Sequence, residues 1–501
     1  MSIYSPASGM MDSNFTVCHA IMLLFRRLGP HLKKGIYELS NDLIYKSAKD
    51  LLGLFERKEA SPVEVIRAVL GRVEERDKDI NAFIFVDEEA ALAQAKDSEK
   101  RWNEGKPQGL LDGVPISIKD MVLTNGWPTL RGSLSVDPEG PWEEDAPCVA
   151  RLREHGAVIF GKTTMPEFGW KGVGDCELTG ITRNPWDLGK TPGGSSGGAS
   201  AALAARMGPL AIGGDAGGSI RIPSSLTGVF GFKANYGRVP SYPEGAMRNL
   251  THIGPMALTV EDAALLLTVI AEPDHRDWTR LVYSNENFAN HLDEGIAGLR
   301  IAYSPDLGYA RVDSSVKKVV AAAVQIFDDL GAKVEEVSPG FDDPLPIFLT
   351  HWGAGGAGAL GSLSEEKKSK LEPALRGFVE RSQNIPLKDY TDAMNQRAAL
   401  CVHMREFHQK YDLLLTPSTA VPAFEVSRRS PSGRGDWDWT PFSYPFNLTQ
   451  QPACSIPAGF TEAGLPVGLQ VIADSFRDDL VLRAAHAFER VAKVNSLPPG
   501  F

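Results

Sequence analysis

Short apolar runs alternate with longer segments of helical periodicity along most of the chain. The clearest case is an apolar run at Arg300–Tyr303, a helical pattern over Ser314–Leu330 and a second apolar run at Val334–Val337. Two strands joined by a helix favour parallel pairing. Helices that alternate with short apolar strands predict an α/β protein whose sheet is covered on both faces.

A helix start is signalled at Ser61-Pro62. Serine is a preferred N-cap residue and proline is favoured at the first helical position, so the pattern predicts a helix over 62–75. A second helix is expected over 90–102, and a short buried strand over 157–161.

The segment Leu111–Asp120 predicts a turn followed by a short buried strand that ends at Lys119. Lysine is seldom buried without a partner, so its place at the end of an apolar strand is unusual. The alternative is a surface lysine paired with Asp120. Burial would instead lower the lysine pKa, and a neutral lysine can act as a base.

Residues 1–40 precede the part of the chain that carries the remaining signals. The apolar run Phe15–Phe25 is followed by Arg26 and Arg27. A secretory signal has its charges before the apolar run, and a membrane span needs about 20 apolar residues. A short amphipathic helix is expected here. It could cap the core, dock on a partner subunit or contact a membrane surface, and these three roles stay open.

The composition is that of an ordinary globular protein. The chain has 501 residues, of which 43% are hydrophobic and 23% charged, and a net charge of -11. That length suits several domains or one large α/β unit. The negative charge argues against a sequence-independent nucleic-acid binder, which would need a basic surface.

Cysteine and histidine usage points away from disulfides and metals. The five cysteines are scattered and form no C-x-x-C pair, which favours a reducing, cytoplasmic compartment. The ten histidines show no H-x-H or H-E-x-x-H spacing, so no metal site is predicted.

Two glycine-rich runs stand close together in the middle of the chain. Gly193–Gly198 contains Ser195, and Gly217-Gly218-Ser219 follows, with 24 residues from Ser195 to Ser219. Such runs are often flexible linkers. Apolar and helix-forming residues flank both runs, however, and glycine lets a ligand approach main-chain N–H groups, which suits an oxyanion hole around a nucleophile.

With these residues in place, the chain resembles the amidase signature family from about residue 40 to the C-terminus. The matching segments are 113–120, 164–168, 184–186, 191–198, 214–223, 236–240, 412–417 and 464–470. The resemblance implies one large mixed β-sheet flanked on both faces by many α-helices. It divides the chain into an extension over 1–40 and a catalytic domain over 41–501, with a variable substrate-pocket region at about 340–445.

The resemblance also implies a Ser–Ser–Lys triad. Lys119 matches the base, Ser195 the bridging serine beside a cis peptide, and Ser219 the nucleophile. The oxyanion hole would be formed by the N–H groups of Ala216, Gly217, Gly218 and Ser219, the loop would be braced by Asp215 and Arg221, and substrate would contact Gly169 and Ser195. No cofactor and no metal are implied.

The implied function is an amidase that hydrolyses a small-molecule amide through an acyl-serine intermediate. No nucleic-acid partner and no transmembrane segment are expected, and a homodimer is possible. The alternative is the glutaminase A subunit of a tRNA-dependent amidotransferase, which shares the triad. Such subunits typically carry glutamine after the Arg221 equivalent, where this chain has Ile222. Two S-x-x-K sequences, at Ser315 and Ser364, fit polar helices better than a penicillin-binding-type site, whose other motifs are missing.

Several tryptophans lie in the variable region. Trp352, Trp437 and Trp439 suggest an apolar acyl or aryl group in the substrate, because ligand pockets are mostly apolar with few polar anchors. The same tryptophans would equally suit a protein core. His351 is interpreted as structural.

Overall fold

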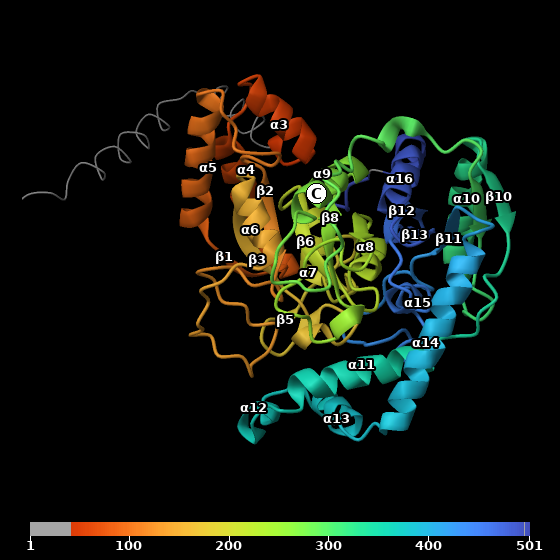
Figure 1. Cartoon of the computed structure of the whole chain (residues 1–501). Helices are drawn as coiled ribbons and strands as arrows, with labels where there is room; N and C mark the ends of the chain where they lie inside the picture. The colour runs from red at the N-terminus through yellow and green to blue at the C-terminus, as the bar shows by residue number, and fades with distance from the viewer. Residues whose placement is uncertain (1–41, 495, 501) are drawn as a thin grey trace, which may run out of the picture.

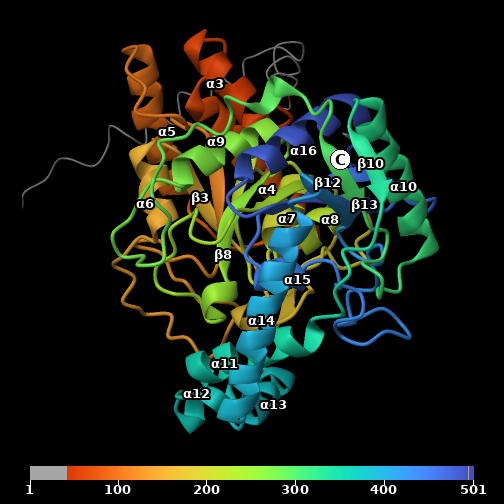
Figure 2. The same cartoon turned by 45° about the vertical axis from the view of Figure 1, so that its right-hand side comes forward.

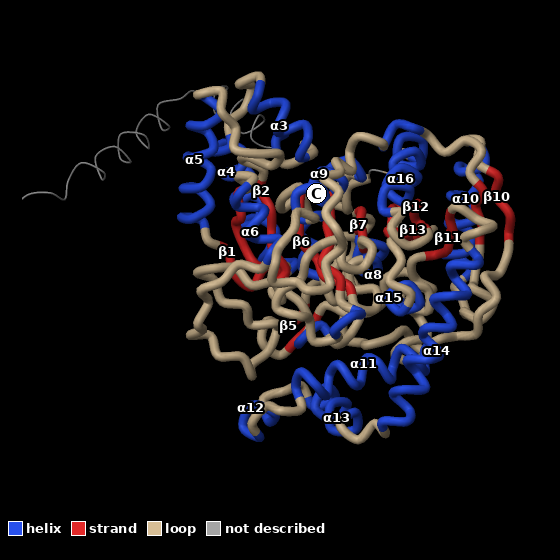
Figure 3. The backbone as a smooth tube through the Cα atoms, in the orientation of Figure 1, coloured by secondary structure: helices blue, strands red, loops and turns tan. Residues whose placement is uncertain are grey.

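The computed structural model describes residues 42–494 and 496–500, so the expectations for residues 1–40 lie outside the described residues. Eleven strands form one mixed sheet in the order β1-β3-β2-β6-β8-β7-β12-β13-β11-β9-β10, with helices around it (Figures 1 and 3). Their bounds are β1 Phe83–Val86, β2 Pro115–Lys119, β3 Val158–Thr163, β6 Leu210–Asp215, β7 Phe230–Lys233, β8 His252–Ala257, β9 Arg300–Tyr303, β10 Lys333–Glu336, β11 Leu413–Pro417, β12 Ala453–Phe460 and β13 Pro466–Ala473. A small separate pair consists of β4 Asp175–Cys176 and β5 Gly180–Ile181.

The helices of the described residues come from every part of the sequence. Their bounds are α3 Ala48–Glu56, α4 Pro62–Ile80, α5 Glu88–Asn103, α6 Pro147–Glu154, α7 Gly197–Ala204, α8 Arg221–Thr227, α9 Val260–Ile270, α10 Ser314–Asp329, α11 Leu345–Leu360, α12 Glu365–Ser369, α13 Pro373–Ser382, α14 Leu387–Phe407, α15 Tyr444–Leu448 and α16 Asp478–Ala492. Short 3-10 turns are η1 Glu167–Gly169, η2 Arg248–Leu250 and η3 Leu292–Glu294.

Both faces of the sheet are buried, as the sequence predicts. Successive side chains of a strand point to opposite faces. In β11, Leu413 and Leu415 pack in one core cluster with residues of α9, α10 and α16, whereas Leu414 packs in another with residues of α14 and α15. Near the other end of the sheet, α4, α5 and α7 pack around Phe160 of β3. The α/β prediction is therefore confirmed.

The strand–helix–strand prediction near residue 300 is also confirmed. Strands β9 and β10 pair in parallel, with Arg300 opposite Lys333, and α10 joins them. The second strand begins and ends one residue earlier than predicted, and α10 ends at Asp329.

Helix α4 starts where the sequence predicts and ends later. The Ser61 side chain accepts from the Glu64 N–H, and the Glu64 carboxylate accepts from the Ser61 N–H, so a full capping box is present. The predicted end near residue 75 is wrong. The helix continues to Ile80, which is fully buried, and stops only at Asn81, whose backbone is left-handed.

The sheet brings two loops together at one edge. Strands β2 and β6 are parallel neighbours, with Ile118 opposite Ile212. Their carboxyl ends therefore meet at the same edge, where ligands commonly bind in α/β sheets. Lys119 is the last residue of β2 and Asp215 the last residue of β6, so their side chains start from adjacent strands.

Between β10 and β11 the chain leaves the sheet and forms α11 to α14. Figures 1 and 2 show α11, α12 and α13 lying together at one end of the molecule, and α14 running back toward the sheet. This excursion covers most of the region that the sequence marks as variable. Within the described residues, no helix combines the length and apolar character that a membrane crossing needs.

Candidate functional site

Lys119 is fully buried and its amine has three polar neighbours. Nζ lies 2.8 Å from Ser195 Oγ, 2.8 Å from Ser196 Oγ and 3.2 Å from the Gly214 carbonyl oxygen. The lysine is not paired with Asp120, whose carboxylate accepts instead from the backbone N–H groups of Leu130 and Gly132. The amine is therefore directed into the glycine-rich core of the site.

The pKa of Lys119 falls from its ordinary value to about 7. Burial is the main cause, because it disfavours the charged ammonium, and the negative charge of Asp215 opposes the fall. A substantial fraction of the amine is then neutral near neutral pH. A neutral amine has a lone pair, so it can accept the proton of a serine hydroxyl at hydrogen-bond distance.

The two serine-containing runs meet in space. The Gly194–Ser195 peptide bond is cis. The Ser196 N–H donates to the Ser219 carbonyl oxygen at 3.0 Å, which ties the two runs together. Ser195 and Ser219 line one cleft, together with Gly169, Ala216 and Met247, which places all three expected triad residues within one small region.

The loop after β6 is folded around the carboxylate of Asp215. Asp215 accepts from the Gly218 N–H at 2.8 Å and from the Ile220 N–H at 3.1 Å. The N–H groups of Ala216, Gly217 and Ser219 donate to no acceptor in the described part of the chain. Three of the four expected oxyanion donors are therefore free. The expectation that Gly218 is an oxyanion donor is corrected, because its N–H donates to the Asp215 carboxylate.

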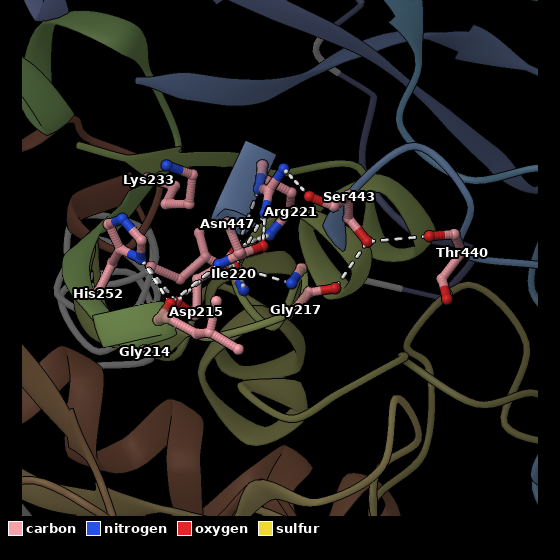
Figure 4. Close-up of polar contacts among 12 residues, drawn as sticks. Gly214, Asp215, Gly217, Ile220, Arg221, Lys233, His252, Thr440, Ser443 and Asn447 are labelled. Atoms are coloured by element: carbon pink, nitrogen blue, oxygen red, sulfur yellow. Dashed lines mark hydrogen bonds and ion pairs between the residues drawn. The ribbon is translucent and has the colours of Figure 1, made fainter. Parts of the chain in front are cut away.

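Arg221 holds that carboxylate and links it to distant segments. Its guanidinium donates to Asp215 through Nε at 3.0 Å and Nη2 at 2.9 Å. It also donates to Asn447 Oδ1 at 2.6 Å (Figure 4). A further bond runs to Gln470 Oε1 at 2.8 Å. Burial alone would raise the pKa of Asp215, but the charge and hydrogen bonds of Arg221 outweigh it and keep that pKa below its ordinary value. The brace implied by the family resemblance is thus present as a buried ion pair.

Ser443 connects the loop after β6 to the segment that carries Thr440. Figure 4 shows its hydroxyl between Gly217 and Thr440, with Oγ 2.7 Å from the Gly217 carbonyl oxygen and 3.1 Å from that of Thr440. A Cβ at Gly218 would collide with Ser443 Oγ, and the φ of Gly218 is +121°. Only glycine fits that position, because both the space and the backbone exclude a side chain.

Two further buried basic side chains, Lys233 and His252, lie near the loop after β6. Their hydrogen bonds are to backbone carbonyl groups and not to Ser195 or Ser219. Lys233 donates to the Gln451 carbonyl, and burial, followed by the charge of Arg221, lowers its pKa to about 7. His252 Nδ1 lies 2.8 Å from the Leu250 carbonyl and 3.2 Å from that of Asp215, while burial and then Lys233 lower its pKa well below normal. His252 is therefore a neutral donor that supports the loop backbone (Figure 4).

Ser219 also lines a second cavity. We call it the tryptophan cavity, because its wall includes Trp170, Trp352, Trp437 and Trp439. Trp352 and Trp437 are in edge contact, with ring centroids 5.8 Å apart. Trp439 is also almost fully buried against Phe424, so the pocket and core interpretations of the tryptophans both apply.

Gly169 contributes to the walls of both spaces. It lines the cleft with Ser195 and the tryptophan cavity. Its φ is +69°, and a Cβ there would lie 2.9 Å from Ser195 Oγ. A larger residue would therefore push on the bridging serine.

The two S-x-x-K sequences and His351 line neither the cleft nor the tryptophan cavity. Lys318 is exposed on α10, and no residue of α12, which carries the second S-x-x-K sequence, is buried. His351 is buried against Tyr390, and burial lowers its pKa to about 4. Across residues 42–494 and 496–500, no group of three or more His, Cys, Asp or Glu residues is arranged to hold a metal.

Sequence reasoning did not assign Ser196, Ser443 or Asn447. Ser196 stands inside the glycine-rich run, so the spacing of that run was a usable signal. Ser443 and Asn447 lie more than 220 residues from Asp215 in the sequence, and no local pattern marks them. Gln470 does fall in a segment that supports the family resemblance, at 464–470, although its role as an Arg221 partner was not predicted.

Comparison with known proteins gives a consistent result. The sequence model of the family described as Amidase matches residues 64–482. An acylamidase from Rhodococcus erythropolis is 35% identical over 464 residues, covering 90% of this chain and 96% of that protein. The A subunit of the glutamyl-tRNA(Gln) amidotransferase of Carboxydothermus hydrogenoformans is 35% identical over 484 residues, covering 91% and 99%. Among solved structures, a bacterial aryl acylamidase of the amidase signature family superposes with a TM-score of 0.85 at 28% identity, covering 91% of this chain and 99% of that one.

Proposed function

The chain belongs to the amidase signature family, whose members hydrolyse amides, and from this premise we propose that Lys119, Ser195 and Ser219 carry the reaction. The observation that carries the proposal is the buried Lys119 amine, which lies 2.8 Å from Ser195 Oγ. Ser195 and Ser219 in turn line the same cleft. The product is a carboxylate plus ammonia or an amine, formed through an acyl-Ser219 intermediate.

In the first step the Ser219 hydroxyl attacks the amide carbonyl carbon. Its proton passes to Ser195 Oγ, and the Ser195 proton passes to the neutral Lys119 amine. A hydroxyl both donates and accepts, so serine suits the middle position. The proton then returns through Ser195 to the amide nitrogen, and the C–N bond breaks with its electron pair on nitrogen. Water hydrolyses the acyl-enzyme by the same proton route and restores Ser219.

The tetrahedral oxyanion would be held by the free N–H groups of Ala216, Gly217 and Ser219. Removing one such donor typically costs roughly 3–4 kcal/mol of transition-state stabilisation. Gly218 has a different part in this proposal, because its N–H fixes the loop on Asp215.

We place the acyl group of the substrate in the tryptophan cavity, which favours an apolar or aryl acyl group. Aromatic walls contribute a large apolar contact area. The cavity also contains Arg429, which stacks over Trp170 at 4.3 Å and pairs with Asp436 at 2.8 Å, so its charge is already compensated.

The likeness to an amidotransferase A subunit supports a second candidate, a glutaminase that works with partner subunits. Glutamine would need a cation for its carboxylate. Both cations on the cavity wall are engaged: Arg429 pairs with Asp436, and Lys171 pairs with Asp175 and Glu372. Ile222 also lines this wall. Amidotransferase A subunits typically carry glutamine at the position of Ile222.

The test is intact mass after exposure to a fluorophosphonate, together with assays of ammonia and amine release from aliphatic, aryl and amino-acid amides. We expect a single adduct at Ser219 and turnover of apolar amides. Ser219→Ala should lose both, whereas Ser200→Ala, which alters a buried serine of α7 bonded to the Gly197 carbonyl, should keep both. Turnover of glutamine alone would favour the second candidate, and absence of any adduct would reject the proposed nucleophile.

A further inference from the structure

Ser219 lines two small spaces of about 30 Å³ each. One is the tryptophan cavity. The other, the cleft with Ser195, adjoins a larger cavity of about 280 Å³, which we call the Met121 cavity. The cleft and this cavity share four wall residues, Met121, Phe168, Ala246 and Thr251.

The Met121 cavity has a mainly apolar wall. It includes Leu123, Cys148, Ile253 and Leu360, and burial raises the pKa of the Cys148 thiol to about 12, so that thiol stays uncharged. The charged wall residues are Arg131 and Glu244, which have opposite signs. Such a cavity favours an uncharged apolar group, because burying an unpaired charge is costly.

The position of Ser195 tells which part of the substrate faces which space. In the proposed mechanism Ser195 Oγ returns the proton to the leaving nitrogen, so that nitrogen must lie within hydrogen-bond reach of it. Ser195 lines the cleft that adjoins the Met121 cavity and is not part of the tryptophan cavity wall. The nitrogen and its substituent therefore face the Met121 cavity, and the acyl group faces the tryptophans.

We propose that the substrate is an N-substituted amide whose leaving group is an apolar amine held in the Met121 cavity. This inference rests on the proposed function and narrows its substrate class. A primary amide would release ammonia, which leaves that cavity without a substrate group. An alkyl or aryl substituent would bury apolar surface there, and binding energy from such remote groups can be used in the transition state.

The reaction balances with water as the only co-reactant. The C–N bond breaks, nitrogen keeps the electron pair and takes the proton that came from Ser219, and the amine leaves. Water then supplies the oxygen of the carboxylate and the proton that Ser219 regains.

The experiment compares one acyl group across four amides: the primary amide and its N-methyl, N-butyl and N-cyclohexyl derivatives. The three alkylamine leaving groups have similar basicity, so differences between them report binding and not leaving-group chemistry. We expect kcat/KM to rise at least tenfold from the N-methyl to the N-cyclohexyl amide. Equal kcat/KM for the primary and N-cyclohexyl amides would overturn the inference while leaving the amidase function intact.

Two variants reduce the cavity without touching the triad. Ala359→Trp acts at an exposed wall residue on α11, and Leu123→Trp acts at a half-buried one. Each should lower kcat/KM for the N-cyclohexyl amide about tenfold and leave the primary amide within about twofold. Ala322→Trp, at an exposed position of α10, is the matched control and should alter neither. If both cavity variants left kcat/KM for the N-cyclohexyl amide unaffected, the amine would not occupy this cavity. If the unchanged protein turned over none of the four amides and formed no fluorophosphonate adduct, the proposed function itself would be rejected.

Discussion

Lys119 must be uncharged to accept a proton, so the state of one amine controls the first step. Its pKa of about 7 has its origin in burial, and the neighbouring hydroxyls offer no charge to offset the desolvation of an ammonium. The rate of the proposed reaction should therefore depend on pH in the neutral range.

We expect kcat/KM to rise with pH and to level off above an inflection near 7. Below that value the amine is protonated in the folded protein and the reactive fraction falls about tenfold per pH unit. The measurement is a pH–rate profile with a neutral amide substrate. The control variant Ser200→Ala should give the same profile. An inflection at about pH 10, where lysine ordinarily titrates, would contradict a lowered pKa of Lys119.

The triad members should behave as a unit when they are removed. Ser219→Ala and Lys119→Ala should each lower kcat by on the order of a thousandfold or more, and the double variant should be no worse than Ser219→Ala alone. Single-turnover assays on the three proteins measure this. Additive losses would mean that Lys119 acts by a route that does not pass through Ser219.

At the scale of elements, the start of α15 is attached to the loop after β6, which carries the proposed oxyanion donors. Ser443 donates to the Gly217 carbonyl, and Asn447 donates to Asp215 Oδ1 at 2.9 Å. The peptide between Gly217 and Gly218 is therefore oriented by a helix far away in the sequence. It lies between the two peptides that carry the N–H groups of Gly217 and Ser219, so its orientation constrains both proposed donors.

We expect Ser443→Ala to lower kcat about tenfold with little change in KM, because the loop donors lose their orientation in the transition state. The decisive readout is a trifluoromethyl ketone that mimics the tetrahedral intermediate, whose affinity should fall in step with kcat. The matched control is Ser455→Ala, which removes a buried hydroxyl of β12 that is bonded to Ser418. A fall in thermal stability with unchanged ketone affinity would make Ser443 merely structural.

The elements also show what local sequence patterns can and cannot predict. The start of α4 was predictable because a capping box is local, but its end was not, since Ile80 continues the helix through its burial. The proposed triad followed from the family resemblance of the segments around Lys119, Ser195 and Ser219, and it stays a prediction. The engagement of the Gly218 N–H by Asp215 and the anchoring by Ser443 depend on how separate loops meet, which no single segment encodes.

At the scale of the whole molecule, Arg221 joins the centre of the sheet to the C-terminal part of the chain. It is fully buried and contacts Asp215, Asn447 of α15 and Gln470 of β13. Removing one partner of such a pair leaves the other charge buried and unpaired.

We expect Arg221→Met to lower the free energy of unfolding by about 3–5 kcal/mol. Urea unfolding followed by fluorescence and by residual activity measures this loss. Lys318→Met removes an exposed ion pair with Glu462 and should leave the unfolding midpoint unchanged. A midpoint for Arg221→Met equal to that of the unchanged protein would show that the pair contributes specificity and not stability.

Six of the thirteen wall residues of the tryptophan cavity come from two stretches that contribute no strand: Trp352 from α11, before β11, and five residues from segment 428–440, after it. The other seven wall residues and the proposed triad come from residues 119–222. Insertions, deletions or exchange of the two strandless stretches can therefore alter which amide is accepted without changing strand order or the reacting groups. In evolutionary terms, part of the selectivity can therefore be inherited separately from the reacting groups. A chimaera between two relatives would have to preserve the hydrogen bond of Ser443 to the Gly217 carbonyl, because it connects the two parts of the chain.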